Sequence, residues 1–437
     1  MTVTHPEPGT AVDGLDGFRH RYAEVNGTRI HYVIGGAGPA VVLVHGFPFT
    51  WAVWREVMPL LAAQGYTVLA PDLRGMGDSG PAESDTFAKT NVAEDIGQIV
   101  LGLELGPINL VGMEVGGMVV YAYASRHPDE VRRLVLSETL IPGFGLEEMM
   151  NPSVDGGTYS FGFHGQVDLA TFLTQGKETA FLTPFYRLTS VRPDAEEYGV
   201  AHYLPHFTGP NGIRGGFQHY GAMVEDGKAN RAEFTTRLPM PVLVLHGDHG
   251  YFRDQLLAGA RQVAEHFETD VIPQASHAYA FDNPQATAER FQRFFAVSDT
   301  ERLVVVDEIR QFMAQYVSYA DRKQFDRLSQ LFAPEATFTI HDPQGAQVMR
   351  MTGPKEIEDV ITTSVGDATA IHHLFSFTTE VHSPVAASST VAMEDWIDGS
   401  TLKVRGYGHY HGEFAKVDGS WRIEKFVETR LRTDVLS

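Results

Sequence analysis

The chain contains no cysteine. This absence excludes disulfides, thiolate nucleophiles and cysteine-bound metal sites together. Basic residues are scarce as well: 34 Lys and Arg stand against 55 Asp and Glu, which gives a formal net charge of −21. Such a balance disfavours nucleic acid and anionic membrane surfaces as partners.

Long apolar runs are also missing, because no stretch approaches the roughly 18 residues that a membrane-spanning helix needs. Residues 1–14 lack the basic start and apolar core that are typical of a secretory signal peptide. We therefore expect a cytoplasmic protein. With 437 residues, 43% hydrophobic and 20% charged, the composition is that of an ordinary globular protein with two domains.

Short apolar runs alternate with helical stretches from about residue 22 to residue 295, and this rhythm predicts a doubly wound α/β sheet. The rhythm breaks between about residues 142 and 236, which favours an inserted, mostly helical cap. The predicted domain order is an N-terminal arm at 1–21 and the α/β domain at 22–296. The predicted buried parallel strands are 41–44, 67–70, 108–111, 134–136 and 242–245.

A different pattern begins near residue 300, after a predicted linker at 297–303. The first element is a helix with one apolar face, and later segments have the turn signals and lengths of strands. This order predicts a separate α+β domain at 304–437 with antiparallel strands. Those strands are expected at 336–340, 371–381, 390–397, 402–417 and 421–431.

Residues 111–117 read VGMEVGG, which is the frame of a nucleophile elbow between a strand and a helix. The glycines allow the close backbone approach of this strained turn. The reactive position holds Glu114. A carboxylate there excludes a serine-hydrolase mechanism.

Three other motifs accompany the elbow: HGFP at 45–48, PDLRGMGDS at 71–79 and ASH at 275–277. With them, residues 22–296 resemble the α/β-hydrolase superfamily and, within it, the epoxide hydrolase branch. The resemblance implies that the backbone amides of Phe47 and Val115 form an oxyanion hole and that His277 is the catalytic base. His45 and Trp51 are expected near the substrate pocket.

The acid that orients His277 has two candidate positions. The family's usual spacing after the strand at 242–245 falls on Gly250, which carries no carboxylate, and Asp248 lies two residues earlier. Some epoxide hydrolases place the acid after the preceding strand, and the stretch LSETLIP at 136–142 resembles that arrangement. Glu138 is therefore favoured over Asp248. Either would fix the imidazole tautomer and stabilise its cation.

The resemblance also implies a cap tyrosine that protonates the opening epoxide. GFQHYGA at 216–222 resembles the family motif and assigns this role to Tyr220. The family adds a second tyrosine or a histidine. Tyr159 is the first candidate for that partner, and Tyr186 is a weaker one.

Glutamate at the elbow extends one methylene further than the family's aspartate, a difference near the misplacement that attack geometry tolerates. We therefore expect Glu114 to act as an acid–base or electrostatic group and not to form an ester. The predicted function is epoxide opening in a bulky apolar molecule, by water or by a substrate hydroxyl that closes a ring, with no cofactor or metal. The alternative is a non-catalytic binding or scaffold protein.

Residues 304–434 resemble the SnoaL-like members of the nuclear transport factor 2 superfamily, a curved sheet around a cone-shaped pocket. The likeness rests on YADR at 319–322, LFAPEA at 331–336, IHHL at 371–374 and GSWRI at 419–423. It favours a structural or dimerising role, with a second site as the alternative, and it suggests polyketide-type metabolism by analogy. The candidate pocket residues are Tyr319, Asp321, His341, His373, Tyr410 and His411.

Overall fold

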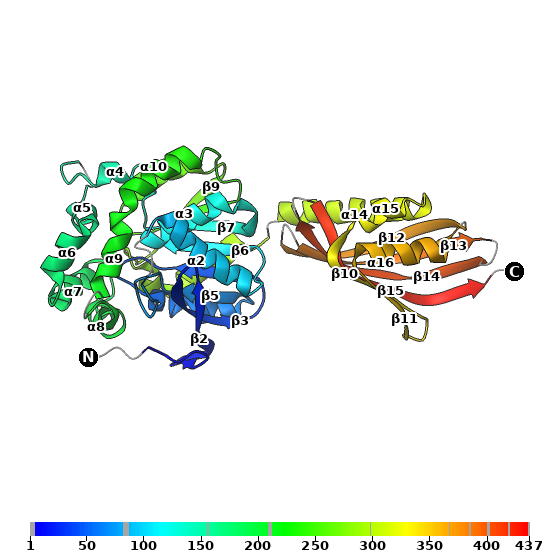
Figure 1. The fold of residues 1–437 in the computed structure, drawn as a ribbon, viewed down its shortest axis with the longest axis horizontal. Coiled ribbons are helices and arrows are strands. Elements are labelled where there is room, and N and C mark those ends of the chain that lie inside the picture. Colours follow the sequence, from blue (N-terminus) through cyan, green and yellow to red (C-terminus); the bar gives the residue numbers. More distant parts are fainter. Residues whose placement is uncertain are drawn as a thin grey trace. The chain divides into compact units, whose positions relative to one another are not determined.

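The computed structural model describes residues 5–81, 87–154, 157–208, 212–297, 299–366, 368–383, 386–399, 403–417 and 420–435. The chain divides into two compact units, Met1–Phe295 and Ala296–Ser437 (Figure 1). Each unit has its own hydrophobic core. Among the described helices, none combines the length and the apolarity that a membrane span requires.

The first unit is built on a nine-stranded sheet with the order β1-β2-β3-β5-β4-β6-β7-β8-β9. Neighbouring strands from β5 to β9 run parallel, and β1 to β3 extend this part as an antiparallel edge. The strands are β1 Ala11–Val12, β2 Leu15–Val25, β3 Thr28–Gly36, β4 Ala40–Val44, β5 Thr67–Pro71, β6 Ile108–Met113, β7 Val131–Ser137, β8 Val242–Gly247 and β9 Phe267–Ile272.

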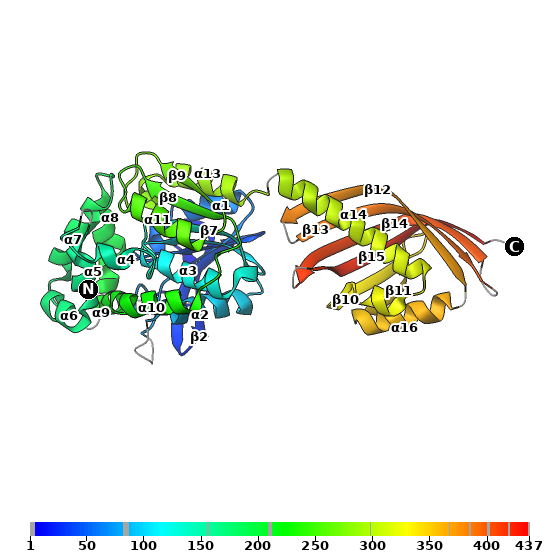
Figure 2. The same ribbon diagram turned by 90° about the horizontal axis from the view of Figure 1, so that it is seen from above.

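Helices cover both faces of this sheet (Figures 1 and 2), so β4 and β6 are buried along their whole length, as the apolar runs predict. The helix pair α1 and α13 lies on one face, and the pair α2 and α3 lies on the other. The helices outside the cap are η1 Trp51–Trp54, α1 Val57–Ala63, α2 Lys89–Gly102, α3 Val115–Arg126, η2 Pro128–Glu130, α11 Arg253–Val263, α12 Tyr279–Asp282 and α13 Pro284–Phe295.

The helical cap lies between β7 and β8, where the sequence predicts it. Its helices are α4 Leu146–Met149, α5 Tyr159–Gly165, α6 Val167–Thr174, α7 Glu178–Leu188, α8 Ala195–His202, η3 Leu204–Phe207, α9 Gly212–Gly221 and α10 Met223–Glu233. Because the cap follows the carboxyl end of β7, it is placed at the edge of the sheet where ligands bind in such folds.

Two predicted boundaries need correction. Residues 15–21 are not a separate arm but belong to β2, because Leu15 and Phe18 are buried against the sheet. Residues 299–303 are not a linker but open α14 (Asp299–Asp321). No Gly or Pro interrupts residues 299–304, so the helix extends upstream of its first buried residue, Val305.

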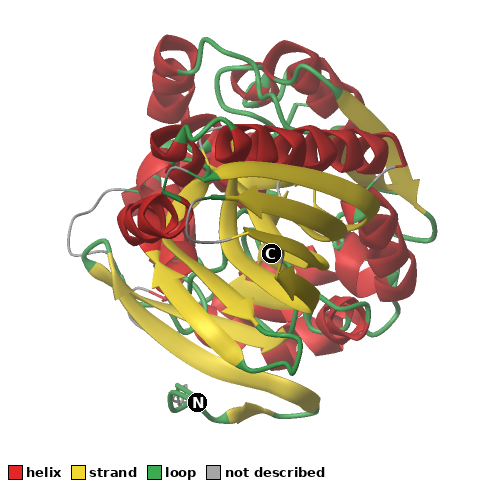
Figure 3. Cartoon of the chain, turned by 90° about the vertical axis from the view of Figure 1, so that its right-hand side faces the viewer, coloured by secondary structure: helices red, strands yellow, loops and turns green. Residues whose placement is uncertain are grey.

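The second unit is a strongly curved sheet with the order β11-β10-β15-β14-β13-β12 (Figure 3). α14 packs against β12 and β13, and α16 packs against β10 and β11. The elements after α14 are α15 Phe325–Ser329, β10 Phe332–His341, β11 Gln347–Thr352, α16 Gly353–Val365, β12 Thr369–Ser383, β13 Ala386–Asp398, β14 Lys403–Val417 and β15 Ser420–Val435.

The α+β prediction for this unit is confirmed, but the all-antiparallel prediction is wrong. β10 pairs with β15 in parallel. The chain crosses from β11 through α16 to the far edge of the sheet, and three hairpins then return it to β10. β11 and α16, which the sequence analysis did not find, make this crossing.

Candidate active site

Glu114 lies in the turn between β6 and α3 with φ 52° and ψ −126°, a conformation that costs free energy for a residue with a side chain. The flanking glycines make this turn possible. A Cβ atom at Gly116 would lie 2.4 Å from the Val44 carbonyl oxygen, and one at Gly112 would lie 2.4 Å from the Gly116 carbonyl oxygen. The sequence frame therefore folds as a nucleophile elbow.

The carboxylate of Glu114 is held at both oxygen atoms. The backbone amides of Phe47 and Val115 donate to Oε2 at 2.7 and 2.6 Å. The hydroxyl of Tyr220 donates to Oε1 at 2.6 Å. Burial raises the pKa of Glu114, and these three hydrogen bonds offset only part of that rise. The two predicted oxyanion-hole amides thus bind the elbow side chain itself.

His277 is oriented by Glu138. Its Nδ1 lies 3.2 Å from Oε2 of Glu138, and the carboxylate also accepts the backbone amides of Gly247 and Tyr251 at 3.0 and 2.9 Å. A Cβ atom at Gly250 would lie 1.9 Å from Oε1 of Glu138. The Glu138 carboxylate therefore occupies the space of a side chain at position 250.

Asp248 does not contact the imidazole. Its two carboxylate oxygens accept the backbone amides of Gln274 and Ala275 at 2.8 and 2.9 Å. These bonds close the loop that leads to His277. The structure thus gives Asp248 the local turn contacts that are typical of an aspartate after a strand, and the alternative assignment of the acid is wrong.

Tyr220, on α9, is buried and lines the cavity above Glu114. The structure places it in direct contact with the elbow, as its hydrogen bond to Oε1 shows. It does not lie across an open gap from the carboxylate. The added methylene of Glu114 explains this direct contact, because it carries the carboxylate toward the cap. Burial, followed by the charge of Glu114, raises the pKa of Tyr220 well above its ordinary value.

His164, on α5, is a site residue that the sequence analysis missed. Its ring lies 4.7 Å from the ring of Tyr220, and it lines the same cavity. Its buried Nδ1 has no hydrogen-bond partner among the described residues. Burial lowers the pKa of His164 to about 4, so the ring is neutral near pH 7. A histidine in the helix that begins at Tyr159 was the available signal.

The two predicted tyrosine partners do not contact Tyr220. Tyr159 opens α5 at the rim of the cavity and is 72% exposed. Tyr186 is buried against Tyr203, with ring centroids 5.5 Å apart, and its neighbour Phe185 faces the cavity instead. Adjacent helical residues point about 100° apart, so α7 cannot present both side chains to the same space.

His45 and Trp51 support the site from outside the cavity, which corrects their predicted place as pocket residues. His45 donates from Nδ1 to the Gly46 carbonyl at 2.9 Å, and its Nε2 accepts the Leu73 amide at 3.0 Å. Burial lowers the pKa of His45, which favours the neutral ring that these contacts need. The Trp51 amide donates to Asp72 at 2.8 Å. Both residues hold the loops around the oxyanion hole.

The cavity beside Glu114 and His277 has a volume of about 360 Å³, within the range of small-molecule sites. Neither Lys nor Arg occurs among its described lining residues, so the site is suited to an uncharged ligand. The apolar part of the lining consists of Met118, Leu140, Phe161, Phe185, Leu188 and Phe252.

In the second unit, the structure places the predicted pocket residues in different surroundings. Asp321 accepts from Nδ1 of His372 at 2.7 Å. His373 is the wrong histidine, because side chains alternate along β12 and its own is 60% exposed. Tyr410 is buried and stacks on Phe426, with centroids 5.0 Å apart.

The other predicted residues of this unit do not join that interior group. Tyr319 lines a separate cavity of about 760 Å³ and interacts with Gln315 at 2.7 Å. His341 donates to the Gly345 carbonyl at 3.3 Å in an exposed turn. His411 contacts Thr390 and Thr429, each at 3.1 Å, on the sheet face opposite to Tyr410.

The sequence analysis did not predict an ion cluster that lies inside the second unit. The guanidinium of Arg430 forms two hydrogen bonds of 2.6 Å with Asp395, and its Nε lies 2.5 Å from Glu428. A Cβ atom at Gly406 would lie 1.9 Å from Nη1 of Arg430, so only glycine in β14 lets the pair meet across that strand. The alternation of side chains between the two sheet faces along β13 and β15 was the available signal for this cluster.

Comparisons with known proteins agree with this architecture. A family model described as alpha/beta hydrolase fold matches residues 39–284, and one described as SnoaL-like domain matches residues 301–427. A soluble epoxide hydrolase of Corynebacterium sp. (strain C12) is 32% identical over 282 residues, which are 63% of this chain and 97% of the relative. A fluoroacetate dehalogenase of Burkholderia sp. is 36% identical over 138 residues, which are 31% of this chain and 45% of the relative.

Two solved structures extend the likeness. Cfl2 from Burkholderia cenocepacia is 34% identical, with a TM-score of 0.60, over 65% of this chain and 98% of that protein. The epoxide hydrolase CorEH is 31% identical, with a TM-score of 0.58, over 64% of this chain and 98% of that protein. These findings confirm both predicted resemblances. The chain belongs to the α/β-hydrolase family, as an epoxide hydrolase-like member that carries a SnoaL-like domain after the hydrolase domain.

Proposed function

We propose that this protein opens an epoxide in an uncharged, largely apolar small molecule without forming an ester on Glu114. The observation that carries the proposal is the 2.6 Å hydrogen bond between Tyr220 and Oε1 of Glu114. In a covalent mechanism these two groups flank the substrate, with the tyrosine at the epoxide oxygen and the carboxylate behind the epoxide carbon.

The distances disfavour covalent attack. A hydrogen bond of about 2.7 Å to the epoxide oxygen and an attack distance of roughly 3–3.5 Å require several ångströms more than the observed O–O separation of 2.6 Å. Glu114 could open that gap only by withdrawing. Withdrawal would sacrifice its hydrogen bonds to the amides of Phe47 and Val115.

The same contact suits a proton relay. In the protonated form, Glu114 donates from Oε1 to the oxygen of Tyr220, which frees the tyrosine hydrogen for the epoxide oxygen. As the ring C–O bond breaks, the Tyr220 proton moves to the departing oxygen and the Glu114 proton replaces it. Burial, which raises the pKa of Glu114, favours the protonated starting form.

The nucleophile is activated on the other side of the cavity. His277, oriented by Glu138, takes a proton from the attacking oxygen while that oxygen bonds to the epoxide carbon. A water molecule in this role gives a diol. A hydroxyl of the substrate gives a ring. The proton on His277 then returns to Glu114 through solvent, which completes the cycle.

The lining indicates the substrate class. Without a described Lys or Arg in the cavity, a carboxylate substrate such as a haloacetate has no counter-ion, so a dehalogenase function is disfavoured. The apolar lining favours a hydrocarbon-rich epoxide. We place this reaction in specialised, polyketide-type biosynthesis in the cytoplasm, by analogy with other SnoaL-like proteins.

Turnover of uncharged epoxides tests the proposal. We expect the protein to convert aryl and long-chain alkyl epoxides to diols, and hydroxy-epoxides to cyclic ethers, and we expect His277→Ala to abolish both reactions. Ligand binding is measured in parallel by calorimetry. Tight epoxide binding with no turnover by the wild-type protein would contradict the proposal and favour the alternative of a non-catalytic binding protein.

For the second unit we propose homodimerisation through the outer face of its sheet. Ile371 and Trp396 are direct cross-strand neighbours in β12 and β13, and both are more than 40% exposed. Phe375 extends the same face along β12 and is 50% exposed. Contiguous exposed apolar surface marks interaction sites, and these three side chains are the apolar part of the face that we propose to be the contact surface.

A second acid–base site is the other candidate function of this unit. The Asp321–His372 pair repeats the orientation of an imidazole by a carboxylate that Glu138 and His277 show. Product analysis of His372→Ala tests this candidate. We expect epoxide opening to continue at the wild-type rate while the final product changes. An unchanged product profile would remove the second site.

A further inference from the structure

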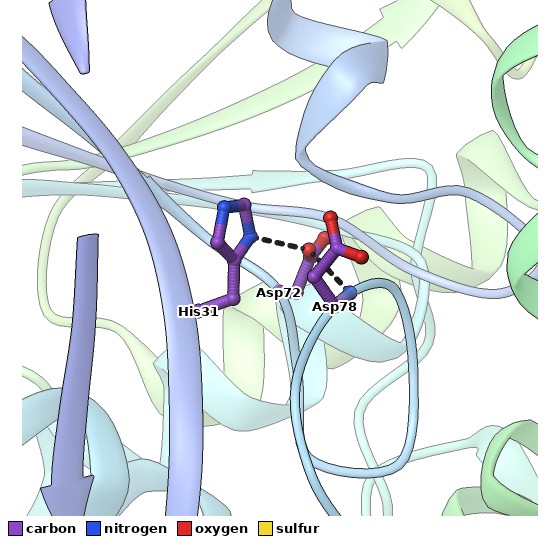
Figure 4. A group of neighbouring side chains, drawn as sticks. All are labelled: His31, Asp72 and Asp78. Atoms are coloured by element: carbon purple, nitrogen blue, oxygen red, sulfur yellow. Dashed lines mark hydrogen bonds and ion pairs between the residues drawn. The ribbon is translucent and has the colours of Figure 1, made fainter. Parts of the chain in front are cut away.

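Two aspartates outside the cavity hold loops that belong to the active site. Asp72 holds the loop after β5, because its carboxylate accepts from His31 at 2.7 Å and from the Asp78 amide at 3.0 Å (Figure 4). These three residues all come from the hydrolase domain outside the cap. Asp282, the last residue of α12, differs from Asp72 because it joins the loop of His277 to the cap.

His277 depends on its backbone for alignment. Among the described residues, its ring has one hydrogen bond, the contact of 3.2 Å between Nδ1 and Oε2 of Glu138. That distance is at the upper limit of the usual range. The rings of Phe49, Phe185 and Tyr251 have their centroids 6.2, 6.4 and 5.9 Å from that of His277. Such ring contacts orient a side chain only weakly, so the backbone on both sides of His277 sets where the imidazole points.

Residues 189–192, which follow α7 in the cap, hold α12 at both of its ends. At the start of α12, the Ala278 amide donates to the Thr189 carbonyl at 2.8 Å. At the end of α12, the Ser190 hydroxyl donates to Oδ1 of Asp282. Because α12 begins two residues after His277, the cap segment is bonded to the chain immediately beyond the base.

Two further contacts strengthen this junction between the cap and α12. The Val191 amide lies 3.3 Å from each carboxylate oxygen of Asp282. Arg192 donates from Nη1 to the Phe281 carbonyl at 3.1 Å, and its guanidinium lies 4.0 Å from the centroid of the Phe281 ring. Leu188, the last residue of α7, lines the substrate cavity. The cap segment that borders the cavity therefore also holds the helix that follows His277.

The other oxygen of Asp282 completes the link to the base. The Ser276 amide donates to Oδ2 of Asp282 at 2.7 Å, so the residue before His277 is bonded to the same carboxylate as Ser190. All of these partners are donors, and an ionised carboxylate accepts several donors at once. Catalytic groups keep a productive geometry only where hydrogen bonds outside the site lock them in place. Asp282 supplies such bonds on the His277 loop.

We infer that Asp282 is a positioning residue for His277 and that it aligns this base from the cap. This inference rests on the proposed function, because it takes His277 as the base that activates the nucleophile. Bonded to Ser276 on one side and to Ser190 on the other, Asp282 keeps the imidazole directed at both Glu138 and the cavity. A misplacement of about 1 Å can lower the rate of such a reaction by roughly 10²-fold.

Proton NMR tests the alignment of His277 without any substrate. A proton on Nδ1 that is bonded to a carboxylate gives a signal far downfield, and His277→Ala assigns the signal of His277 by its disappearance. The buried pair of His31 and Asp72 (Figure 4) serves as the internal reference, because Nδ1 of His31 also faces a carboxylate, at 2.7 Å. In parallel, kcat and KM are measured with an epoxide that the wild-type protein converts.

Three variants separate the two ends of the link. Asp282→Ala removes both carboxylate oxygens, whereas Asp282→Asn keeps one acceptor oxygen for the Ser276 amide. Ser190→Ala removes only the contact of the hydroxyl from the cap. Asp168→Ala is the matched control, because this carboxylate also lies in the cap but is 90% exposed and binds Arg214 at 2.7 Å.

We expect Asp282→Ala to lose the downfield signal of His277, to keep that of His31 and to lower kcat by roughly 10–10²-fold with little change in KM. Asp282→Asn should restore part of both losses. Ser190→Ala should broaden the His277 signal and lower kcat less than Asp282→Ala does. Asp168→Ala should match the wild-type protein in both measurements.

A wild-type His277 signal in Asp282→Ala overturns the inference, and so does the absence of that signal from the wild-type protein. If Asp282→Ala does not fold, Ser190→Ala decides, and an unchanged His277 signal in that variant overturns the inference. A wild-type protein that converts no epoxide contradicts the proposed function instead, and the NMR comparison then still shows whether Asp282 positions His277.

Discussion

At the scale of the residue, the extra methylene of Glu114, relative to aspartate, changes which step of the reaction this carboxylate serves. It allows Glu114 to keep both oxyanion-hole amides and still reach the hydroxyl of Tyr220. In our account, Glu114 therefore serves the protonation of the epoxide oxygen. His277 and Glu138 alone serve the nucleophile.

Tyr220→Phe tests whether the Tyr220 hydroxyl protonates the epoxide oxygen. Removal of the hydroxyl deletes the group that protonates the epoxide oxygen, and we expect kcat to fall by roughly 10²–10⁴-fold, the usual worth of a positioned general acid. Steady-state kinetics and a ligand-binding isotherm measure the effect and show that the pocket survives. Because Tyr251→Phe alters a hydroxyl that bonds the Leu188 carbonyl at the cavity rim, it is the matched control. A Tyr220→Phe variant with wild-type kcat would exclude the relay.

The pH dependence follows from the proton on Glu114. Burial raises the pKa of Glu114, so the protonated, active form persists to higher pH than for an ordinary glutamate. The rate should fall as pH rises through that pKa. Glu114→Gln keeps the size and the amide contacts but cannot titrate, so its slower rate should lack this fall. A wild-type pH profile with the same shape as the Glu114→Gln profile would contradict the account.

At the scale of the element, this chain differs from the family's usual arrangement in the strand that carries the acid partner of His277. Glu138 follows β7, and its carboxylate fills the space beside Gly250 after β8. A carboxylate on one strand therefore excludes a side chain on the other. This exclusion explains why the usual position is glycine in this chain.

Gly250→Asp should therefore damage the site. Its Cβ would lie 1.9 Å from Oε1 of Glu138, and we expect a loss of roughly 1–3 kcal/mol in the free energy of unfolding, the usual cost of overpacking, together with lower kcat. Glu138→Asn removes the opposing charge at a position with φ 46°, which Asn tolerates. The double variant should exceed both single variants in kcat. A Gly250→Asp protein as stable and active as the wild type would refute the exclusion.

Sequence alone could predict what local patterns and motifs encode. The elbow around Glu114 and the strand rhythm from β4 to β8 were predictable because each depends on short stretches of chain. His164 was not, since its contact with Tyr220 arises only when α5 and α9 pack together. Arg430 was missed for the same reason, because its partner Asp395 lies two strands away in the sheet.

At the scale of the whole molecule, each unit has its own core, which agrees with separate tasks for the two domains. We expect the protein to be a dimer through Ile371, Phe375 and Trp396. Trp396→Glu should shift it to the monomer in analytical ultracentrifugation while kcat for epoxides stays unchanged. Leu101→Glu, at a residue of the first unit that is 78% exposed, is the control. A wild-type monomer, or a Trp396→Glu dimer, would contradict this proposal.

The central claim is that the oxygen added to the substrate comes directly from solvent and not from Glu114. A single turnover in heavy-oxygen water, with enzyme in excess over a convertible epoxide, tests it by mass spectrometry of the diol and of the peptide that contains Glu114. The account predicts heavy oxygen in the diol and none in Glu114. Heavy oxygen in the Glu114 carboxylate, with an unlabelled diol, would demonstrate a covalent ester and contradict the account.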